Sequence, residues 1–351
     1  MKNIAIIGCG DISGIYLQNL TGKFADRLNV AGIYDLVADK AKSRAKEFGI
    51  KRVYDCIDEI LGDAEVDIVL NLTRPYEHYG VSVRALEAGK HVYTEKPLAA
   101  SLAEGQALVA LAKEKNLLIG GAPDTFLGAG IRTCRQLISD GEIGDIVGAS
   151  AFMLCRGHES WHPDPAFYYQ YGGGPMMDMG PYYLTAMINL AGAVKAVTGI
   201  AKASFPTRTI TSAAKHGTVV KVEVPTHITG VIEFASGAVG TITTSFDVCA
   251  AEVPRIEIYG AKGTLSVPDP NTFAGPVRLY RHETGSWQEI PLQFDHSENS
   301  RGLGLYEMVC HLEDGSVHLA SGELLLHVLE VMTAFNSAYE KRTFVEIESV
   351  I

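Results

Sequence analysis

Short apolar runs alternate with segments of helical spacing over roughly the first 120 residues. The apolar runs lie at 3–8, 30–34, 66–72, 91–94 and 117–121, with a further short strand predicted at 52–54, and helical spacing follows most of them. Such continuous runs are typical of strands buried on both faces, and their alternation with helices predicts a parallel sheet. Residues 1–122 are therefore expected to form a doubly wound α/β domain.

The pattern changes after Pro123. Strand-like segments dominate from 194 to 292, and turn sequences such as 235–237 and 260–263 separate them. This spacing predicts hairpins and a mainly antiparallel sheet, with helices near 176–190, 303–312 and 323–339. Along 241–248, polar and apolar residues alternate, so one face of that strand should pack on helices and the other should stay open. Residues 123–351 are expected to form a second, α+β domain with a large open sheet.

Composition and charge limit the partners that the chain is expected to have. The 351 residues are 47% hydrophobic and 20% charged, which is ordinary for a globular protein of about two domains. A net charge of −11 gives no basic footprint for nucleic acid or an anionic membrane. Six widely spaced cysteines form no C-x-x-C pair, and no apolar run is long enough to span a membrane. We expect a cytoplasmic protein that acts on a small molecule.

A glycine-rich turn, GCGDISG at 8–14, lies between the first predicted strand and a helix. The dinucleotide-binding fingerprint is G-x-G-x-x-G in that position, because the backbone must approach a pyrophosphate at the helix N-terminus. Ser13 takes the place of the third glycine and is small enough to keep the close packing. The turn predicts pyrophosphate contacts from Gly8, Gly10, Asp11 and Ile12.

Asp35 ends the second predicted strand, where a carboxylate accepts hydrogen bonds from the adenosine ribose. An acid here repels a 2′-phosphate, and Leu36 and Val37 follow it instead of arginine. We therefore expect NAD as the cofactor, with NADP as the alternative. Asp35 is also a candidate cap of the helix near Ala38, and the two roles are compatible.

Polar residues follow the next two strands. Thr73, Arg74 and His78 come after one strand, and Glu95 and Lys96 come after the other. Ligands of open α/β sheets bind at the carboxyl ends of strands, so these side chains are expected to border the cofactor. The alternative for Glu95 and Lys96 is an ordinary ion pair in a surface loop.

Four segments in order resemble the glucose–fructose oxidoreductase, inositol dehydrogenase and rhizopine-catabolism (Gfo/Idh/MocA) family. They are GCGDISG at 8–14, NLTRPYEHY at 71–79, AGKHVYTEKPLA at 88–99 and GGGPMMDMGPYY at 172–183. The resemblance covers nearly the whole chain. It implies a Rossmann domain, a second domain with an open sheet that forms a homodimer or homotetramer interface, and NAD(P)-dependent oxidation or reduction of sugars and cyclic polyols.

The resemblance also implies catalytic roles for Lys96, Asp178 and Tyr182. The commonest family motif is D-x-G-x-H, whereas this chain has Tyr182 in place of the histidine, as glucose–fructose oxidoreductase and dihydrodiol dehydrogenase do. Lys96 and Tyr182 are expected to move the substrate proton, and Asp178 to hold the substrate hydroxyl. Asp178 as a helix N-cap and Tyr182 as a core residue are the alternatives. Asp124 and His162 are the next candidates for the base.

His158, Trp161 and His162 lie in the loop before the glycine run at 172–174. Polar groups suit sugar hydroxyls, and an aromatic face suits the C–H side of a sugar ring. The predicted substrate-binding residues are Lys96, Asp124, His158, Trp161, His162, Asp178 and Tyr182. His158 and His162 have i,i+4 spacing, but the segment is a predicted loop, so we expect no metal ion.

Three functions are compatible with these features. The first is an NAD(P)-dependent oxidoreductase acting on a sugar, an inositol or a related cyclic polyol. The second is an enzyme that holds NAD tightly for a transient oxidation within a net hydrolysis or elimination. The third is a non-catalytic dinucleotide-binding regulator on the same fold. Because Lys96, Asp178 and Tyr182 are all present, the sequence favours an enzyme, and we predict the first function.

Overall fold

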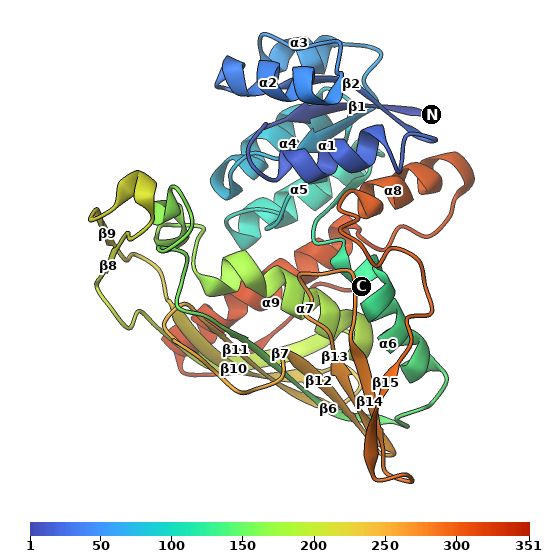
Figure 1. Cartoon of the computed structure of the whole chain (residues 1–351), viewed down its shortest axis with the longest axis vertical. Helices are drawn as coiled ribbons and strands as arrows, with labels where there is room; N and C mark the ends of the chain where they lie inside the picture. The colour runs from blue at the N-terminus through green and yellow to red at the C-terminus, as the bar shows by residue number, and fades with distance from the viewer. The chain divides into compact units, whose positions relative to one another are not determined.

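The computed structural model describes residues 1–351 as two compact units (Figure 1). The first unit contains Met1–Asp124 and Asn299–Leu326, and the second contains Thr125–Glu298 and His327–Ile351. The first break in the chain is next to the predicted boundary at 122. Residues 299–326 differ from the sequence-based division, which assigned them to the second domain.

The first unit is built on a five-stranded sheet with the order β2-β1-β3-β4-β5. All of its strand pairs are parallel, which confirms the predicted Rossmann-type sheet. Its strands are β1 (Lys2–Ile7), β2 (Leu28–Tyr34), β3 (Ile68–Asn71), β4 (His91–Thr94) and β5 (Ile119–Gly121). The predicted strand at 52–54 is reduced to a single bridge between Val53 and Ile33.

Helices connect these strands and bury apolar residues against the sheet. Ile4, Ile6, Ile68 and Leu70 of the strands are fully buried, as is Leu17 of the first helix. The connecting helices are α1 (Ser13–Thr21), α2 (Ala38–Phe48), α3 (Ile57–Gly62), α4 (His78–Glu87) and α5 (Leu102–Glu114), with a short 3-10 turn η1 (Pro75–Glu77). Helix α8 (Leu303–Asp314) belongs to the later segment of this unit and contacts β5.

Asp124 attaches the returning segment 299–326 to the first unit. Its buried carboxylate accepts hydrogen bonds from the N–H groups of Gly302 at 2.8 Å and Gly304 at 3.2 Å, at the start of α8. Farther along, the N–H of Gly121 in β5 donates to Ala320 O at 3.1 Å. Burial raises the pKa of Asp124 to about 6, although the two N–H groups oppose that shift. A sequence pattern holds no sign of these long-range contacts.

The second unit is built on a nine-stranded sheet with the order β15-β14-β13-β12-β6-β11-β10-β7-β16. Neighbouring strands are antiparallel except β6 and β11, which are parallel. The strands are β6 (Ile146–Leu154), β7 (Val194–Lys202), β10 (His227–Phe234), β11 (Val239–Ser245), β12 (Ile256–Gly260), β13 (Gly263–Val267), β14 (Val277–Arg281), β15 (Ser286–Ile290) and β16 (Val345–Glu346). This sheet confirms the predicted α+β domain. A separate hairpin pairs β8 (Thr207–Thr209) with β9 (Val219–Lys221).

Helices cover one face of the nine-stranded sheet (Figure 1). They are α6 (Ala129–Ser139), α7 (Pro175–Ala191) and α9 (Gly322–Lys341), and the shorter turns are η2 (Thr125–Leu127), η3 (Pro165–Tyr169) and η4 (Ala213–Lys215). The ring of Phe335 on α9 fills the space above Gly230 and Gly199, where a Cβ would collide with it. None of the helices combines the length and the apolar composition needed to cross a membrane.

The other face of this sheet exposes apolar side chains, including Ile200, Val231 and Val239. Ile242 and Thr244 of β11 are buried while Thr241 is exposed, as the predicted alternation requires. The alternation fails at Ser245, the last residue of β11, which is fully buried. It also fails at Asp247, beyond the strand, because the Asp247 carboxylate turns to a buried arginine.

Candidate functional site

The glycine-rich turn after β1 has the geometry of an anion site. Gly8 has φ +104, and a Cβ there would lie 2.6 Å from Leu72 O, so only glycine is accommodated. A Cβ at Gly10 would meet nothing within 4 Å, which leaves room for a ligand to approach the backbone. No side chain caps α1, and its first turn has no acid. The N–H groups of Ser13 and Gly14 donate to Gly10 O at 3.1 Å and Asp11 O at 3.3 Å, and the positive end of the helix dipole suits a pyrophosphate.

Asp35 joins this turn to the start of α2. Its Oδ2 accepts the N–H of Cys9 at 2.7 Å and its Oδ1 accepts the N–H of Val37 at 2.8 Å. Val37 is the N-cap residue of α2, and no side chain caps that helix, so the alternative of Asp35 as the helix cap is wrong. Each carboxylate oxygen retains capacity for a further hydrogen bond, which is what a ribose hydroxyl requires.

His78 connects the loops that follow β3 and β4. Its ring is fully buried, with Nδ1 2.7 Å from Pro97 O and Nε2 3.1 Å from Thr73 O. Burial lowers the pKa of His78, and the two carbonyl oxygens oppose that effect. Thr73 is fixed by Asn71 Oδ1, which accepts its hydroxyl at 2.6 Å, while Arg74 is exposed and donates to the Tyr76 hydroxyl at 3.0 Å. His78 thus holds together the loops that follow β3 and β4.

Glu95 points into the core of the first unit. Its carboxylate accepts the hydroxyl of Tyr16 at 2.9 Å and the backbone N–H of Lys96 at 3.0 Å. Burial and the neighbouring carboxylate raise the pKa of Tyr16 well above its usual value, so its hydroxyl remains a donor. Lys96 is half-buried and directly follows these groups beyond the end of β4. This arrangement differs from an ordinary surface loop.

Helix α7 carries Asp178 and Tyr182 on one face, one turn apart. Gly174, with φ +93, is the N-cap residue, and the N–H of Asp178 donates to Gly174 O at 3.0 Å. The alternative of Asp178 as the N-cap is therefore wrong. Tyr182 and Tyr183 are both buried, and Tyr183 completely so. The Tyr183 hydroxyl accepts from Arg255 Nη1 at 3.4 Å.

His158 binds Asp178 from the loop before α7. Its Nε2 lies 3.1 Å from Asp178 Oδ2, and the two side chains are 12% and 14% exposed. The imidazole packs among the rings of Trp161, Tyr168 and Phe246, with centroid distances of 5.2, 4.2 and 4.7 Å. This contact between a predicted substrate-binding residue and a predicted catalytic residue had no counterpart in the sequence pattern.

His162 extends the same cluster. Its ring lies 5.4 Å from those of Trp161 and Tyr168, and its Nδ1 accepts the N–H of Asp164 at 3.0 Å. Trp161 is 62% exposed, so it presents an aromatic face to solvent. In no part of the chain are three or more His, Cys, Asp and Glu side chains grouped so that they could hold a metal ion. The cluster therefore combines polar groups and aromatic faces.

A buried arginine, which sequence reasoning missed, holds this loop in place. Arg208 donates from Nε to Glu159 and from Nη1 to Asp247 at 2.7 Å. Its Nη2 donates to the backbone oxygens of Arg156 at 2.6 Å and Phe246 at 3.0 Å. The partners come from two segments, 156–159 and 246–247, which are distant in sequence from Arg208 and from each other. The only signal in the sequence is the presence of charged residues, which is uninformative by itself.

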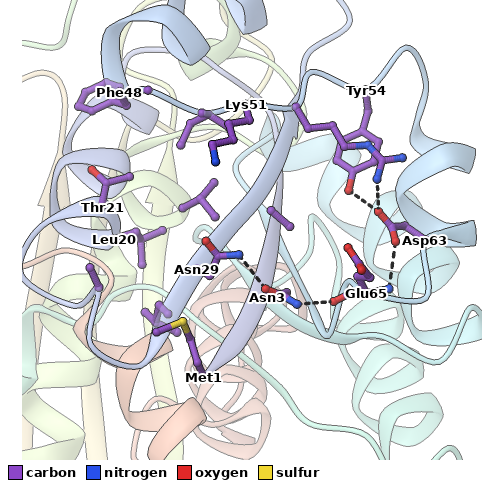
Figure 2. Close-up of a pocket in the computed structure, with 17 residues that line it drawn as sticks. Met1, Asn3, Leu20, Thr21, Asn29, Phe48, Lys51, Tyr54, Asp63 and Glu65 are labelled. Carbon is purple, nitrogen blue, oxygen red and sulfur yellow. Dashed lines mark hydrogen bonds and ion pairs between the residues drawn. The ribbon is translucent and has the colours of Figure 1, made fainter.

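A cavity of about 580 Å³ lies elsewhere in the first unit (Figure 2). Asn3 and Asn29 line it, joined by a hydrogen bond of 2.8 Å near the amino ends of β1 and β2. Tyr54 and Asp63 line it from the other side, also hydrogen-bonded at 2.8 Å. None of the predicted site residues lines this cavity. Because ligands of such sheets bind at the carboxyl ends of strands, it is not the dinucleotide site.

The predicted residues thus form one group in each unit. In the first unit they gather where β1, β2, β3 and β4 end; in the second they gather around the start of α7. Asp124 differs, because its carboxylate is occupied at the start of α8. Its predicted contact with substrate stays a prediction.

Comparison with protein families gives two matches that together cover most of the chain. Residues 2–121 match an oxidoreductase family described as having an NAD-binding Rossmann fold. Residues 131–266 match the GFO/IDH/MocA C-terminal domain. The break between the two matches falls where the first unit gives way to the second.

Individual relatives agree with these matches. The chain is 24% identical over 355 residues to a myo-inositol 2-dehydrogenase of Thermotoga maritima, covering 99% of each protein. An uncharacterized oxidoreductase of Schizosaccharomyces pombe, C26H5.09c, is 29% identical over 200 residues, and that match spans 55% of this chain and 53% of the relative. The structure of a levoglucosan dehydrogenase in complex with NADH has a TM-score of 0.83, with 18% identity and coverage of 99% and 100%. The last likeness shows a shared fold.

Proposed function

Because the chain belongs to the Gfo/Idh/MocA family of NAD-binding oxidoreductases, we propose that it oxidises or reduces a sugar, an inositol or a related cyclic polyol. The observation that carries this proposal is the cluster of His158, Trp161, His162 and Asp178 in the second unit. Its polar groups suit ring hydroxyls, and the exposed face of Trp161 suits the C–H side of the ring. The full-length likeness to a myo-inositol 2-dehydrogenase supports the same substrate class.

NAD, when bound, supplies the acceptor or donor of hydride. Gly10 and its neighbours in the turn would hold the pyrophosphate, since the start of α1 is uncapped and open. Asp35 would accept the ribose hydroxyls. Further contacts are proposed for Thr73, Arg74 and Lys96, at the ends of β3 and β4. His78 and Glu95 are buried with their polar atoms engaged and support the loops that carry these residues.

Oxidation of an alcohol also releases a proton, and the residues proposed to move it are Lys96 and Tyr182. Lys96 carries a cation just beyond the end of β4, and its backbone N–H donates to the carboxylate of buried Glu95. A cation near the substrate oxygen favours the alkoxide that precedes loss of hydride. Tyr182 has a hydroxyl that can pass the proton on, and Asp178 is a carboxylate on the same face of α7.

Activity is tested with a panel of sugars and polyols with NAD and with NADP, followed at the NADH absorbance band. Lys96→Met should abolish turnover and leave NAD affinity, measured by calorimetry, nearly unchanged, because the glycine turn and Asp35 hold the cofactor. Lys115→Met changes an exposed lysine and is the control. Retention of most activity in Lys96→Met would refute the assigned role.

The role proposed for Tyr182 is tested with a matched pair of variants. Tyr182→Phe removes only the hydroxyl and should lower kcat about 10²–10⁴-fold if that hydroxyl relays a proton. Tyr183→Phe makes the same change at a fully buried neighbour bonded to Arg255 and should leave kcat near normal. Equal kcat values for the two variants would show that Tyr182 is a packing residue.

A further inference from the structure

The imidazole of His158 has one nitrogen engaged and one available. Its Nε2 lies 3.1 Å from Asp178 Oδ2. An ionised carboxylate only accepts hydrogen bonds, so Nε2 must carry a proton and donate it. The Nδ1 atom has no hydrogen-bond partner in the protein and is not fully enclosed. In the neutral ring Nδ1 is therefore a basic lone pair that nothing in the protein occupies.

The surroundings fix the direction of this ring. Trp161, Tyr168 and Phe246 pack against it at centroid distances of 5.2, 4.2 and 4.7 Å. The next residue, Glu159, is bound by buried Arg208, whose side chain is 6% exposed. The imidazole is thus oriented by a carboxylate on one side, by aromatic rings around it and by a backbone that is held in place.

We propose that His158, paired with Asp178, is the proton acceptor of the reaction, a catalytic role in addition to the substrate contact expected from the sequence. The histidine comes from the loop before α7 and supplies the imidazole that the D-x-G-x-Y segment of α7 lacks. Arg208 is a positioning residue, because it acts through Glu159. This inference rests on the proposed function for its substrate class.

The proton step balances with the groups named. The O–H bond of the alcohol breaks, and its proton forms an N–H bond at His158 Nδ1. The electron pair left on oxygen becomes the carbonyl bond as hydride leaves the carbon for oxidised NAD. The resulting imidazolium is neutralised by the Asp178 carboxylate, and its proton then passes to water. In the direction of reduction, the same imidazolium returns the proton.

The first experiment tests the hydrogen bond between His158 and Asp178 and needs no measurement of catalysis. Histidine is labelled with ¹⁵N, and long-range ¹H–¹⁵N spectra are assigned for His158 with His158→Gln. We expect a proton on Nε2 that is protected from exchange with water, no proton on Nδ1 of the neutral ring, and loss of the protection in Asp178→Ala. A neutral ring with its proton on Nδ1, or protection that persists in Asp178→Ala, would overturn the pair even if no substrate were known.

The second experiment tests the chemistry on a substrate found in the panel. His158→Gln should lower kcat/KM about 10²–10⁴-fold with NAD affinity unchanged, whereas His216→Gln, at an exposed histidine, should have no effect. In His158→Ala, added imidazole should restore rate, and 1,2,4-triazole, a much weaker base of similar size, should not. Equal rescue by imidazole and triazole would indicate that His158 only packs in the site. A near-normal kcat/KM in His158→Gln would exclude His158 as the proton acceptor. Absence of any substrate would refute the proposed function and leave the spectroscopic result standing.

Discussion

The hydroxyl of Tyr16 donates a hydrogen bond of 2.9 Å to the carboxylate of Glu95, inside the first unit. Tyr16 is fully buried and Glu95 is 7% exposed, so water cannot replace this bond. The contact joins α1, which follows the glycine turn, to the residue before Lys96. The two segments with the strongest functional signals in the sequence are therefore fixed to one another by a single buried bond.

Tyr16→Phe should destabilise the protein by about 1–3 kcal/mol, because it leaves a buried carboxylate with one donor fewer. The matched control is Tyr306→Phe, which removes a 3.0 Å hydrogen bond to Asp26 at an exposed site. That variant should lose less than about 0.5 kcal/mol. Urea unfolding followed by circular dichroism measures both. Equal losses would show that burial does not strengthen the Tyr16 contact.

Arg208→Met should be among the most damaging single substitutions in the second unit. It leaves Glu159 and Asp247, with side chains 11% and 6% exposed, as uncompensated buried charges. Removing one partner of a buried ion pair costs about 3–5 kcal/mol. Lys215→Met breaks the exposed pair with Asp164 and should cost no more than about 1 kcal/mol. Thermal unfolding compares the two, and a small loss in Arg208→Met would contradict the network.

The free energy of unfolding should depend on pH in part because of His318. Burial lowers its pKa to about 4, and its Nε2 has no partner. The unfolded chain, with a pKa of about 6.5, binds the proton more tightly, so this residue's contribution is complete above pH 6.5 and is lost as pH falls toward 4. The loss approaches about 3 kcal/mol at most.

In the same unit, Asp124 changes the free energy of unfolding with pH in the opposite direction. Its pKa is raised to about 6, so its effect on stability increases as the pH falls through that window. The difference in unfolding free energy between the native protein and His318→Phe isolates the histidine, since Asp124 is common to both. That difference should shrink or reverse between pH 7 and pH 4. His216→Gln, at an exposed histidine, should give a constant difference.

The fold was largely predictable because its signals are local. Apolar runs followed by helical spacing mark a parallel sheet, and the turn at 8–14 needs only adjacent residues to be recognised. The second unit was predictable to the level of a mainly antiparallel sheet. The parallel pairing of β6 with β11 was not, because the alternation of side chains along a strand is the same for either direction of its neighbour.

The sequence identified most residues of the candidate site but not the contacts between them. Short motifs identified Asp178 and His158 separately, but only the folded chain shows that they bind one another. The contacts of Arg208 and of Asp124 unite residues that are distant in sequence, and no periodicity marks them. The motif position occupied by Tyr182 did not indicate that a histidine would reach Asp178 from another loop.

Cofactor choice should depend on Asp35. The native protein is expected to bind NAD more tightly than NADP, because a carboxylate bonded to the N–H groups of Cys9 and Val37 would repel a 2′-phosphate. Asp35→Ser should narrow the ratio of the two dissociation constants by roughly tenfold, which is about 1.4 kcal/mol. Asp39→Ser, an exposed acid in the first turn of α2, is the control. Calorimetry that finds equal or tighter NADP binding by the native protein would contradict this.

The open face of the nine-stranded sheet should join copies of the chain into a homodimer or homotetramer. Ile200, Val231 and Val239 are between 38% and 60% exposed on this face, an unusual gathering of apolar side chains on a surface without helices. Light scattering at micromolar concentration should therefore give a mass of two or four chains. A monomer would contradict the prediction.

A substitution at Val231 tests whether the open sheet face forms the interface between copies of the chain. It lies on β10 opposite Thr241 of β11, and β10 is the third strand from the β16 edge of the sheet. In an interface between identical faces, each substitution occurs on both partners, so Val231→Asp would bring like charges into an apolar contact of a chain whose net charge is already −11. We expect that variant to dissociate while its circular dichroism spectrum is unchanged. Val317→Asp makes the same change at a valine 69% exposed in the first unit, and it should leave the mass unaltered.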